Sequence, residues 1–423
     1  MALHTYPDAN ASDPVHMGWM QGSPPPTDRI IRFADGGTTR FPEIRWAFSN
    51  LRQLMPTIAV LRAGPISALP MAVRDDLDAI TFTPLPNSGF DTPMTWQQSL
   101  AANYTDGILV LHRGQIVQER YFGALTPDRV HIAMSVTKSY VGTLAAMLVA
   151  DGSLDPGSLV AAHIPELTHS GFATATIRHL MDMRVGITFS EDYTDPNAAI
   201  WNYARAGSFW PRPPGYTGPT SFYESLRSIP QDRPHGGDFR YQTAITEVLG
   251  WVLRRVTGQP LETLISTRFW QPLGMEHDAC LTVDETGTAM AGAGFNAALR
   301  DQARFGEMLR LGGTANRLGD TANGQQIISP AVIADIARGG DRSAFATAGY
   351  NRMPGASYRN MWWCLHNDHG AYAARGIHGQ AIYIDPVAEM VIARFGSHPM
   401  AANANLDPTS LPAFHALAKH LMA

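Results

Sequence analysis

Apolar residues form two pairs of short runs near opposite ends of the chain. Residues 107–123, "GILVLHRGQIVQERYFG", place two apolar-rich stretches around Arg113–Gly114. Residues 380–396, "QAIYIDPVAEMVIARFG", do the same around Asp385–Pro386. Paired apolar runs joined by turn residues are typical of β-hairpins, so the pattern predicts one hairpin in each segment.

Elsewhere apolar residues recur every three or four positions, as on one face of a helix. In "MSVTKSYVGTLAAMLVADGSL", residues 134–154, this spacing predicts a buried helix with Ser135 on its first turn and a stop near Gly152. Further helices are predicted at residues 244–258, 259–275, 300–313 and 408–422. Strands near both ends and helices between them predict an α/β (α+β) fold, in which both ends of the chain build an antiparallel sheet around a helical insert.

The length of 423 residues exceeds what one ordinary hydrophobic core accommodates, so more than one domain is expected. We predict an N-terminal arm at residues 1–30. Residues 31–130 and 295–423 are predicted to form an α/β domain, and residues 131–294 a mainly helical domain.

Composition narrows the class of protein. Hydrophobic residues make up 45% of the chain and charged residues 16%, which is typical of a globular protein. The net charge of −5 and the lack of a basic block argue against a nucleic-acid partner. The first 30 residues lack the pattern of a signal peptide, and no run approaches the roughly 18 apolar residues that span a membrane. With only Cys280 and Cys364 there is no disulfide framework, so we expect a cytoplasmic protein. Because no apolar run is long enough to span a membrane, we expect no membrane partner.

Lysine is very scarce, and its position is informative. Of 32 basic residues, only Lys138 and Lys419 are lysines. Lys138 follows Ser135 by three positions, so the two side chains share one helix face. A serine hydroxyl needs a base to become a good nucleophile, and a buried lysine with a lowered pKa can act as that base. Arginine cannot, because its guanidinium does not deprotonate in proteins. The pair therefore predicts nucleophilic catalysis.

The chain contains competing patterns as well. A Ser-x-x-Lys pattern also results from a surface lysine behind an N-capping serine. "CLHNDHG" offers Cys364, His366 and His369 as metal ligands, although the same residues fit a polar loop between strands better. "GAGFNA", residues 292–297, imitates a dinucleotide-binding loop but follows no predicted strand. We therefore predict neither a metal nor an organic cofactor.

Two further segments complete a set of three motifs. "FRYQTAITEVLG" places Tyr241 two positions before Thr243, at a predicted helix start. "RGIHGQAIYIDP" places His378 and Gly379 at the start of the second hairpin. Together with Ser-x-x-Lys, these segments resemble the motifs of the serine β-lactamase and penicillin-binding protein superfamily, in its class C branch and esterase relatives.

A narrower resemblance is to the 6-aminohexanoate-dimer hydrolases, which cleave nylon oligomers. Seven segments between about Arg45 and Arg394 resemble that family in order. They are "RWAFSNLRQLMPT", "NYTDGILVL", "MSVTKS", "EDYTDP", "FRYQTA", "WWC" and "GIHGQ".

The resemblance implies a class C β-lactamase-like fold, with an antiparallel sheet flanked by helices, an all-helical domain and an active site between them. It implies that Ser135 forms a covalent acyl-enzyme, that Lys138 is its base and that Tyr241 carries the proton to the leaving group. The backbone N–H groups of Ser135 and Ile377 would form the oxyanion hole. The substrate-binding positions that it implies are Tyr193, Trp363, Thr243, His378, Gly379, Ala204, Met290, Gly292 and Arg375.

Several of these residues fit a purely structural role as well. Tyr193 could cap a loop turn, Trp363 could belong to the core, and Tyr241 could be an aromatic residue at a helix entry. Thr243 could bond Lys138 or only cap the helix that follows. His378 is expected to shape the site rather than to transfer protons.

The sequence also departs from the family. Members that cleave the nylon dimer well carry an Asp after "EDYTDP" that pairs with the substrate's ammonium, and Ala204 aligns with that position. Arg375 would instead bring a positive charge, and the Lys-Thr-Gly typical of β-lactam hydrolysis is missing from the third motif. We therefore predict a serine hydrolase of small-molecule carboxylic esters, or of linear amides with a neutral or acidic end. The alternatives are an acyltransferase on the same fold and a non-catalytic ligand-binding relative. The resemblance also suggests a homodimer.

Overall fold

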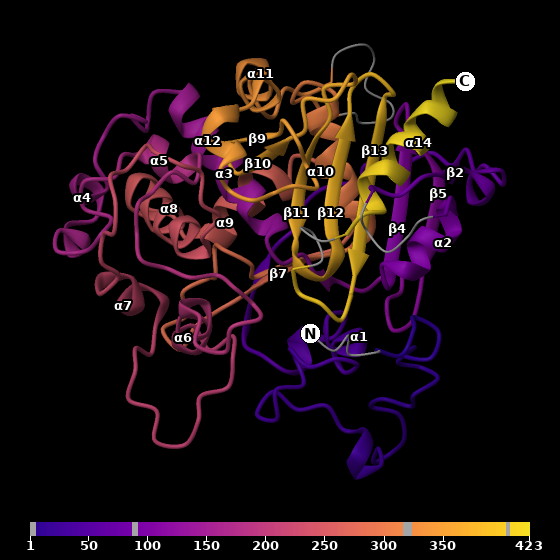
Figure 1. Ribbon diagram of the computed structural model, residues 1–423, viewed down its shortest axis with the longest axis horizontal. Coiled ribbons are helices and arrows are strands. Elements are labelled where there is room, and N and C mark those ends of the chain that lie inside the picture. Colours follow the sequence, from indigo (N-terminus) through magenta and orange to yellow (C-terminus); the bar gives the residue numbers. More distant parts are fainter. Residues whose placement is uncertain (1–5, 87–91, 316–323, 403–406) are drawn as a thin grey trace.

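The computed structural model describes residues 6–86, 92–315, 324–402 and 407–423. Its main feature is a seven-stranded antiparallel sheet with the order β5-β4-β13-β12-β11-β10-β9 (Figure 1). The strands are β4 (Thr105–His112), β5 (Gln115–Tyr121), β9 (Ser357–Arg359), β10 (Trp362–Cys364), β11 (Tyr372–Gly376), β12 (Gln380–Asp385) and β13 (Met390–Gly396). Both predicted hairpins are present, and they meet where β4 pairs with β13. This confirms an antiparallel sheet built from both ends of the chain.

Alternate residues of the central strands enter different cores, as the two-residue period of a strand requires. Leu109 and Leu111 of β4 pack in the core shared with α3 (Val136–Ala150) and α10 (Leu299–Arg310). Ile108 and Val110 pack on the opposite face with α2 (Trp96–Ala102) and α14 (Ser410–Met422). Both faces of the sheet are therefore covered by helices.

The helical part of the chain lies to one side of this sheet (Figure 1). It contains α4 (Val160–His163), α5 (Ile177–Met181), α6 (Ala199–Ala206), α7 (Phe222–Arg227), α8 (Thr243–Thr257) and α9 (Leu261–Ile265). Helix α8 ends at Gly258, whose φ of 66° is the left-handed conformation that glycine adopts easily at a helix end. The single helix predicted for residues 259–275 is instead α9 followed by a π-helical turn, Ser266–Trp270.

A second sheet was not predicted. It has the order β1-β7-β8-β6, made of β1 (Thr57–Val60), β7 (Ala279–Thr282), β8 (Phe295–Ala297) and β6 (His131–Ile132). Strand β6 leads into α3, so this sheet fixes the start of the helix that carries Ser135. It also joins strands from segments that we assigned to different domains, and the domain boundaries stay a prediction.

The remaining α-helices and strands of the described chain are short. They are β2 (Thr81–Phe82), β3 (Met94–Thr95), α1 (Ile44–Ala47), α11 (Pro330–Arg338) and α12 (Arg342–Ala346). Across the described ranges, no helix combines the length and the apolar character needed to cross a lipid bilayer.

Candidate active site

Ser135 lies at the turn between β6 and α3. The backbone N–H of Ala133 donates to the carbonyl oxygen of Phe295 in β8, which anchors the approach to the turn. Met134 has a φ of 47°, a left-handed conformation that a non-glycine residue rarely adopts. Strained backbone of this kind persists only where the surroundings enforce it, and it is common at functional sites. Ser135 is the residue immediately before the buried helix α3.

Lys138 lies one helical turn after Ser135 and is completely buried. Its Nζ lies 2.9 Å from Ser135 Oγ, 3.0 Å from Thr243 Oγ1 and 2.7 Å from the carbonyl oxygen of Gly292. This confirms the predicted contact of Lys138 with Ser135. Burial lowers the pKa of Lys138 to about 8, although the charges of Glu191 and Glu247 oppose that shift. An amine with this pKa is neutral in roughly a tenth of the molecules at pH 7, far more than an ordinary lysine.

Tyr241 precedes α8 and faces the same pair. The Ser135 side chain acts on its hydroxyl, and Lys138 Nζ lies 5.0 Å from the centre of its ring. Burial raises the pKa of Tyr241 well above its usual value, so the phenol is protonated at neutral pH. Ser135, Lys138 and Tyr241 are therefore brought together as the sequence predicted.

The end of β11 approaches the start of α3 very closely. A Cβ atom added to Gly376 would lie 2.8 Å from the carbonyl oxygen of Ala133 and 3.0 Å from the backbone nitrogen of Ser135. Only glycine fits this approach without displacing one of the two backbones. The contact brings Ile377 beside Ser135, at the rim of the same cavity.

That cavity has a volume of about 220 Å³. Residues predicted for the site make up part of its wall: Ser135, Tyr193, Tyr241, Trp363, Arg375 and Ile377. The other lining residues are Glu191, Asp192, Tyr350, Gly376 and Ala402. Trp363 stacks on Tyr241 with ring centres 5.2 Å apart and touches Tyr350 edge-on at 5.1 Å. The wall therefore combines four aromatic side chains with two carboxylates, and the guanidinium of Arg375 lies over Trp363.

Other predicted substrate-binding residues lie outside the cavity wall. Ala204 is buried on α6 and Met290 is buried in the segment between β7 and β8. Gly292 is also covered, because a Cβ there would lie 2.4 Å from Thr243 Cγ2, and it reaches the site only through its carbonyl bond to Lys138. Gly379 lines a separate small pocket.

His378 and Thr243 are not among the residues that line the cavity. His378 has a φ of 63°, its Nδ1 bonds the carbonyl oxygen of His398, and burial lowers its pKa to about 4. It is therefore a neutral residue that holds this turn, and its expected part in shaping the substrate site stays a prediction. Thr243 bonds Lys138, and it is the first residue of α8 rather than its side-chain cap.

Two carboxylates at this site were missed in the sequence. Glu191 accepts hydrogen bonds from Tyr193 Oη at 2.7 Å, from the Thr243 backbone at 2.5 Å and from Thr243 Oγ1 at 2.7 Å. Glu247 lies under the Gly292 segment. The only sequence signal for Glu247 is its place one turn after Thr243 on α8, and for Glu191 its place two residues before Tyr193.

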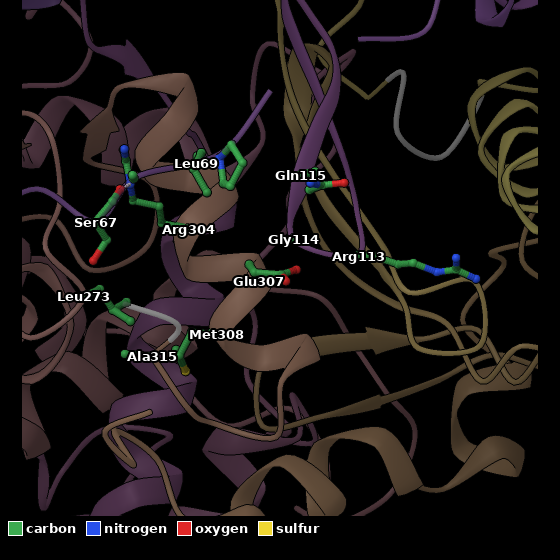
Figure 2. Close-up of a pocket in the computed structure, with 12 residues that line it drawn as sticks. Ser67, Leu69, Arg113, Gly114, Gln115, Leu273, Arg304, Glu307, Met308 and Ala315 are labelled. Atoms are coloured by element: carbon green, nitrogen blue, oxygen red, sulfur yellow. Dashed lines mark hydrogen bonds between the residues drawn. The ribbon is translucent and has the colours of Figure 1, made fainter. Parts of the chain in front are cut away.

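A second cavity, of about 210 Å³, lies against α10 and the turn between β4 and β5 (Figure 2). Figure 2 shows Glu307 and Met308 on its helical side and Arg113 directed outward. Arg304 is held by Asp301 at 2.8 Å. The described residues that line this cavity together with Ser67 include neither Lys nor His. The described lining of this cavity therefore lacks a serine–lysine pair like that of Ser135 and Lys138.

Potential metal ligands give no convincing site. Cys364 donates to the carbonyl oxygen of Ile336, and His366 bonds Ser357, so the "CLHNDHG" residues do not converge. Within the described ranges, one group of three potential ligands lies within 4.8 Å: His369, Asp385 and His415. His369 Nδ1 already bonds Asp385 Oδ2 at 2.8 Å, and the charge of Lys419 acts on His415. These features make the group a poor candidate for a cation.

Comparisons with known proteins show the family and the fold of the chain. A family model described as Beta-lactamase matches residues 98–399. The chain is 33% identical over 395 residues to the 6-aminohexanoate-dimer hydrolase of Paenarthrobacter ureafaciens, covering 93% of this chain and 91% of that one. A solved structure from Bacillus anthracis, described as a 6-aminohexanoate-dimer hydrolase, superposes with a TM-score of 0.80 at 30% identity, over 91% of this chain and 96% of that one. A family VIII carboxylesterase shares the fold, with a TM-score of 0.54 at 17% identity over 77% of this chain and 96% of that one.

Proposed function

Because the chain belongs to the β-lactamase family, and within it to the 6-aminohexanoate-dimer hydrolases, we propose that Ser135, Lys138 and Tyr241 are the catalytic set of this serine hydrolase. Membership of the family confirms the predicted fold class and the predicted hydrolase class. The observation that carries the assignment of residues is the completely buried Lys138 amine, 2.9 Å from Ser135 Oγ at the edge of a cavity.

The hydrogen-bond partners of Lys138 favour its action as a base. A neutral amine has two N–H donors and one lone pair. The Gly292 carbonyl only accepts, and Thr243 Oγ1 gives its own proton to Glu191, so both take an N–H from Lys138. Ser135 is then the neighbour that can donate to the lone pair. In this arrangement the lone pair of the neutral Lys138 amine therefore points to Ser135 Oγ.

In the first half of the reaction, Ser135 Oγ attacks the acyl carbon while its proton passes to Lys138 Nζ. The tetrahedral oxyanion is stabilised by the backbone N–H groups of Ser135 and Ile377. The C–O or C–N bond then breaks, Tyr241 gives its proton to the leaving alcohol or amine, and Lys138 restores the proton of Tyr241. The product is a Ser135 acyl ester. Water attacks this ester by the reverse relay, releasing the carboxylic acid and the free serine.

The cavity indicates which substrates fit. Its aromatic wall suits apolar acyl chains, and Arg375 stays cationic although burial lowers its pKa to about 10. Ala204 is buried and offers no charge to an ammonium group, while Asp192 is an exposed acid at the cavity wall that already bonds Thr194. We therefore place carboxylic esters, and linear amides with a neutral or acidic end, ahead of the nylon dimer.

The test compares hydrolysis of short-chain p-nitrophenyl esters and p-nitroanilides by the wild type, Ser135→Ala and Ser139→Ala. Ser139 is the matched control, because it is buried on the same helix and bonds the Met361 carbonyl rather than Lys138. We expect Ser135→Ala to lose at least about 10³-fold in kcat and Ser139→Ala to stay active. Full activity of Ser135→Ala would refute the assignment.

Acyl transfer shares the same acyl-enzyme and differs only in the second nucleophile. Adding an alcohol or amine to the assay measures the partition, and hydrolysis predicts that free acid remains the main product. We also propose a homodimer on the ground of the family resemblance alone. A cytoplasmic location is supported by Cys280 and Cys364, which are buried free thiols.

A further inference from the structure

Glu247 is a buried carboxylate that the reaction scheme above does not use. It lies one turn after Thr243 on α8 and is 1% exposed. Three donors converge on it. The backbone N–H of Ala291 donates to Oε1 at 3.0 Å, while the backbone N–H of Gly292 and the Tyr203 hydroxyl donate to Oε2 at 3.2 and 2.5 Å. Three donors on one carboxylate favour its ionised form.

Gly292 connects this carboxylate to Lys138. Its N–H points to Glu247, and its carbonyl oxygen accepts from Lys138 Nζ at 2.7 Å. The missing side chain lets the Gly292 backbone lie against Thr243. Glu247 therefore fixes the backbone segment that supplies one of the three hydrogen-bond partners of Lys138.

The charges of the two groups also act on each other. Burial raises the pKa of Glu247 to about 7, against the opposing effect of its hydrogen bonds, and Asp284 adds to the rise. The charged groups that act on Lys138 are Glu191 and Glu247, and both raise its pKa against the larger effect of burial. The titratable neighbours of Glu247 on α6 and α7, Tyr203 and Tyr223, stay neutral because burial raises their pKa values. Removing the charge of Glu247 would therefore lower the pKa of Lys138.

We propose that Glu247 is a positioning residue of the hydrolytic reaction, which orients the Gly292 carbonyl toward Lys138 and sets the proton affinity of the Lys138 amine. This inference rests on the proposed role of Lys138 as base. It assigns to Glu247 no contact with substrate.

The test measures kcat/KM against pH for the wild type, Glu247→Gln, Tyr203→Phe and Glu119→Gln, with thermal unfolding of each variant. Glu119 is the matched control. It is a largely buried carboxylate that accepts a tyrosine hydroxyl at the same 2.5 Å, from Tyr121, and it is not among the charges that act on Lys138. Tyr203→Phe keeps the Glu247 carboxylate and removes one donor, so it remains informative if Glu247→Gln fails to fold.

We expect the acid limb of Glu247→Gln to move to lower pH by about one unit, because the amine loses a nearby negative charge. Tyr203→Phe should move it in the same direction by less, since a carboxylate with fewer donors is protonated more readily. Glu119→Gln should leave the midpoint in place. A uniform loss of rate in Glu247→Gln at all pH values, with an unmoved midpoint, would overturn the inference. An absence of acyl-enzyme on Ser135 in the wild type would instead defeat the proposed function itself.

Discussion

At the scale of single residues, the proposed mechanism depends on the chemistry that distinguishes lysine from arginine. Lys138→Arg keeps a positive charge at the same helix position, but a guanidinium cannot take the Ser135 proton. We expect a loss of at least about 10³-fold in kcat on a p-nitrophenyl ester.

The control for this change is Lys419→Arg, because Lys419 is the other lysine of the chain and is exposed on α14. It should retain wild-type activity. Circular dichroism and thermal unfolding show whether Lys138→Arg is folded. A folded Lys138→Arg with substantial turnover would exclude Lys138 as the base.

The pH dependence follows from the protonation states of the same residues. The protonated Lys138 amine has no lone pair to accept a proton, and its pKa is lowered to about 8, so kcat/KM should rise as pH increases through about 8. Tyr241 must be protonated to act as donor, and its pKa is raised well above its usual value. Activity should therefore not fall again below about pH 10, the usual pKa of a tyrosine. A decline between about pH 8 and 10, in protein that stays folded, would contradict these roles.

At the scale of elements, β11 approaches the start of α3 closely at Gly376. Adding a single methyl group at this residue tests the contact. Gly376→Ala places a Cβ against two backbone atoms, neither of which moves without displacing its element. We expect kcat to fall by about 10- to 100-fold, because a misplacement of roughly 1 Å has that effect on a reacting group. The measurement is ester hydrolysis together with the free energy of unfolding.

Gly237→Ala serves as the comparison, because a Cβ there meets nothing closer than the Pro234 carbonyl oxygen at 3.9 Å. It should leave both activity and stability nearly unchanged. If Gly376→Ala were as active as Gly237→Ala, the alignment of Ile377 with Ser135 would not depend on this contact.

The sequence predicted long elements better than short ones. Both hairpins and the helices at α3, α8, α10 and α14 extend over enough residues for their period to be visible. The sheet of β1, β7, β8 and β6 was missed, because its strands have two to four residues and pair across segments far apart in the chain. Such strands carry too few alternating positions to be recognised.

At the scale of the whole molecule, the site exists only where separate parts of the fold meet. The start of α3, the start of α8, the end of β11 and the loop around Tyr193 each supply residues. Ser135, Lys138 and Tyr241 were predicted because motif spacing marks them. Glu191 begins the segment "EDYTDP", which pointed only to Tyr193, while Glu247 and Tyr350 carry no motif, so only the folded chain brings these three residues to the site.

Alignment with a family also has limits that the fold makes visible. The resemblance aligns Ala204 with a substrate-binding Asp of the family, yet Ala204 is buried on α6 and lies outside the cavity wall. Asp192 lines the cavity from a different place in the sequence, and its carboxylate accepts hydrogen bonds from Thr194. The charge of a pocket therefore follows from its three-dimensional lining, which sequence position alone does not give.

Acylation of Ser135 during turnover is the step on which the whole mechanism depends. Rapid mixing of the wild type and Ser135→Ala with a short-chain p-nitrophenyl ester, followed by quenching and intact-mass analysis, tests it directly. We expect a burst of p-nitrophenol and a mass increase of one acyl group, which maps to Ser135 and is absent from Ser135→Ala. No burst and no adduct on folded wild-type protein, or an adduct on another residue, would contradict this mechanism.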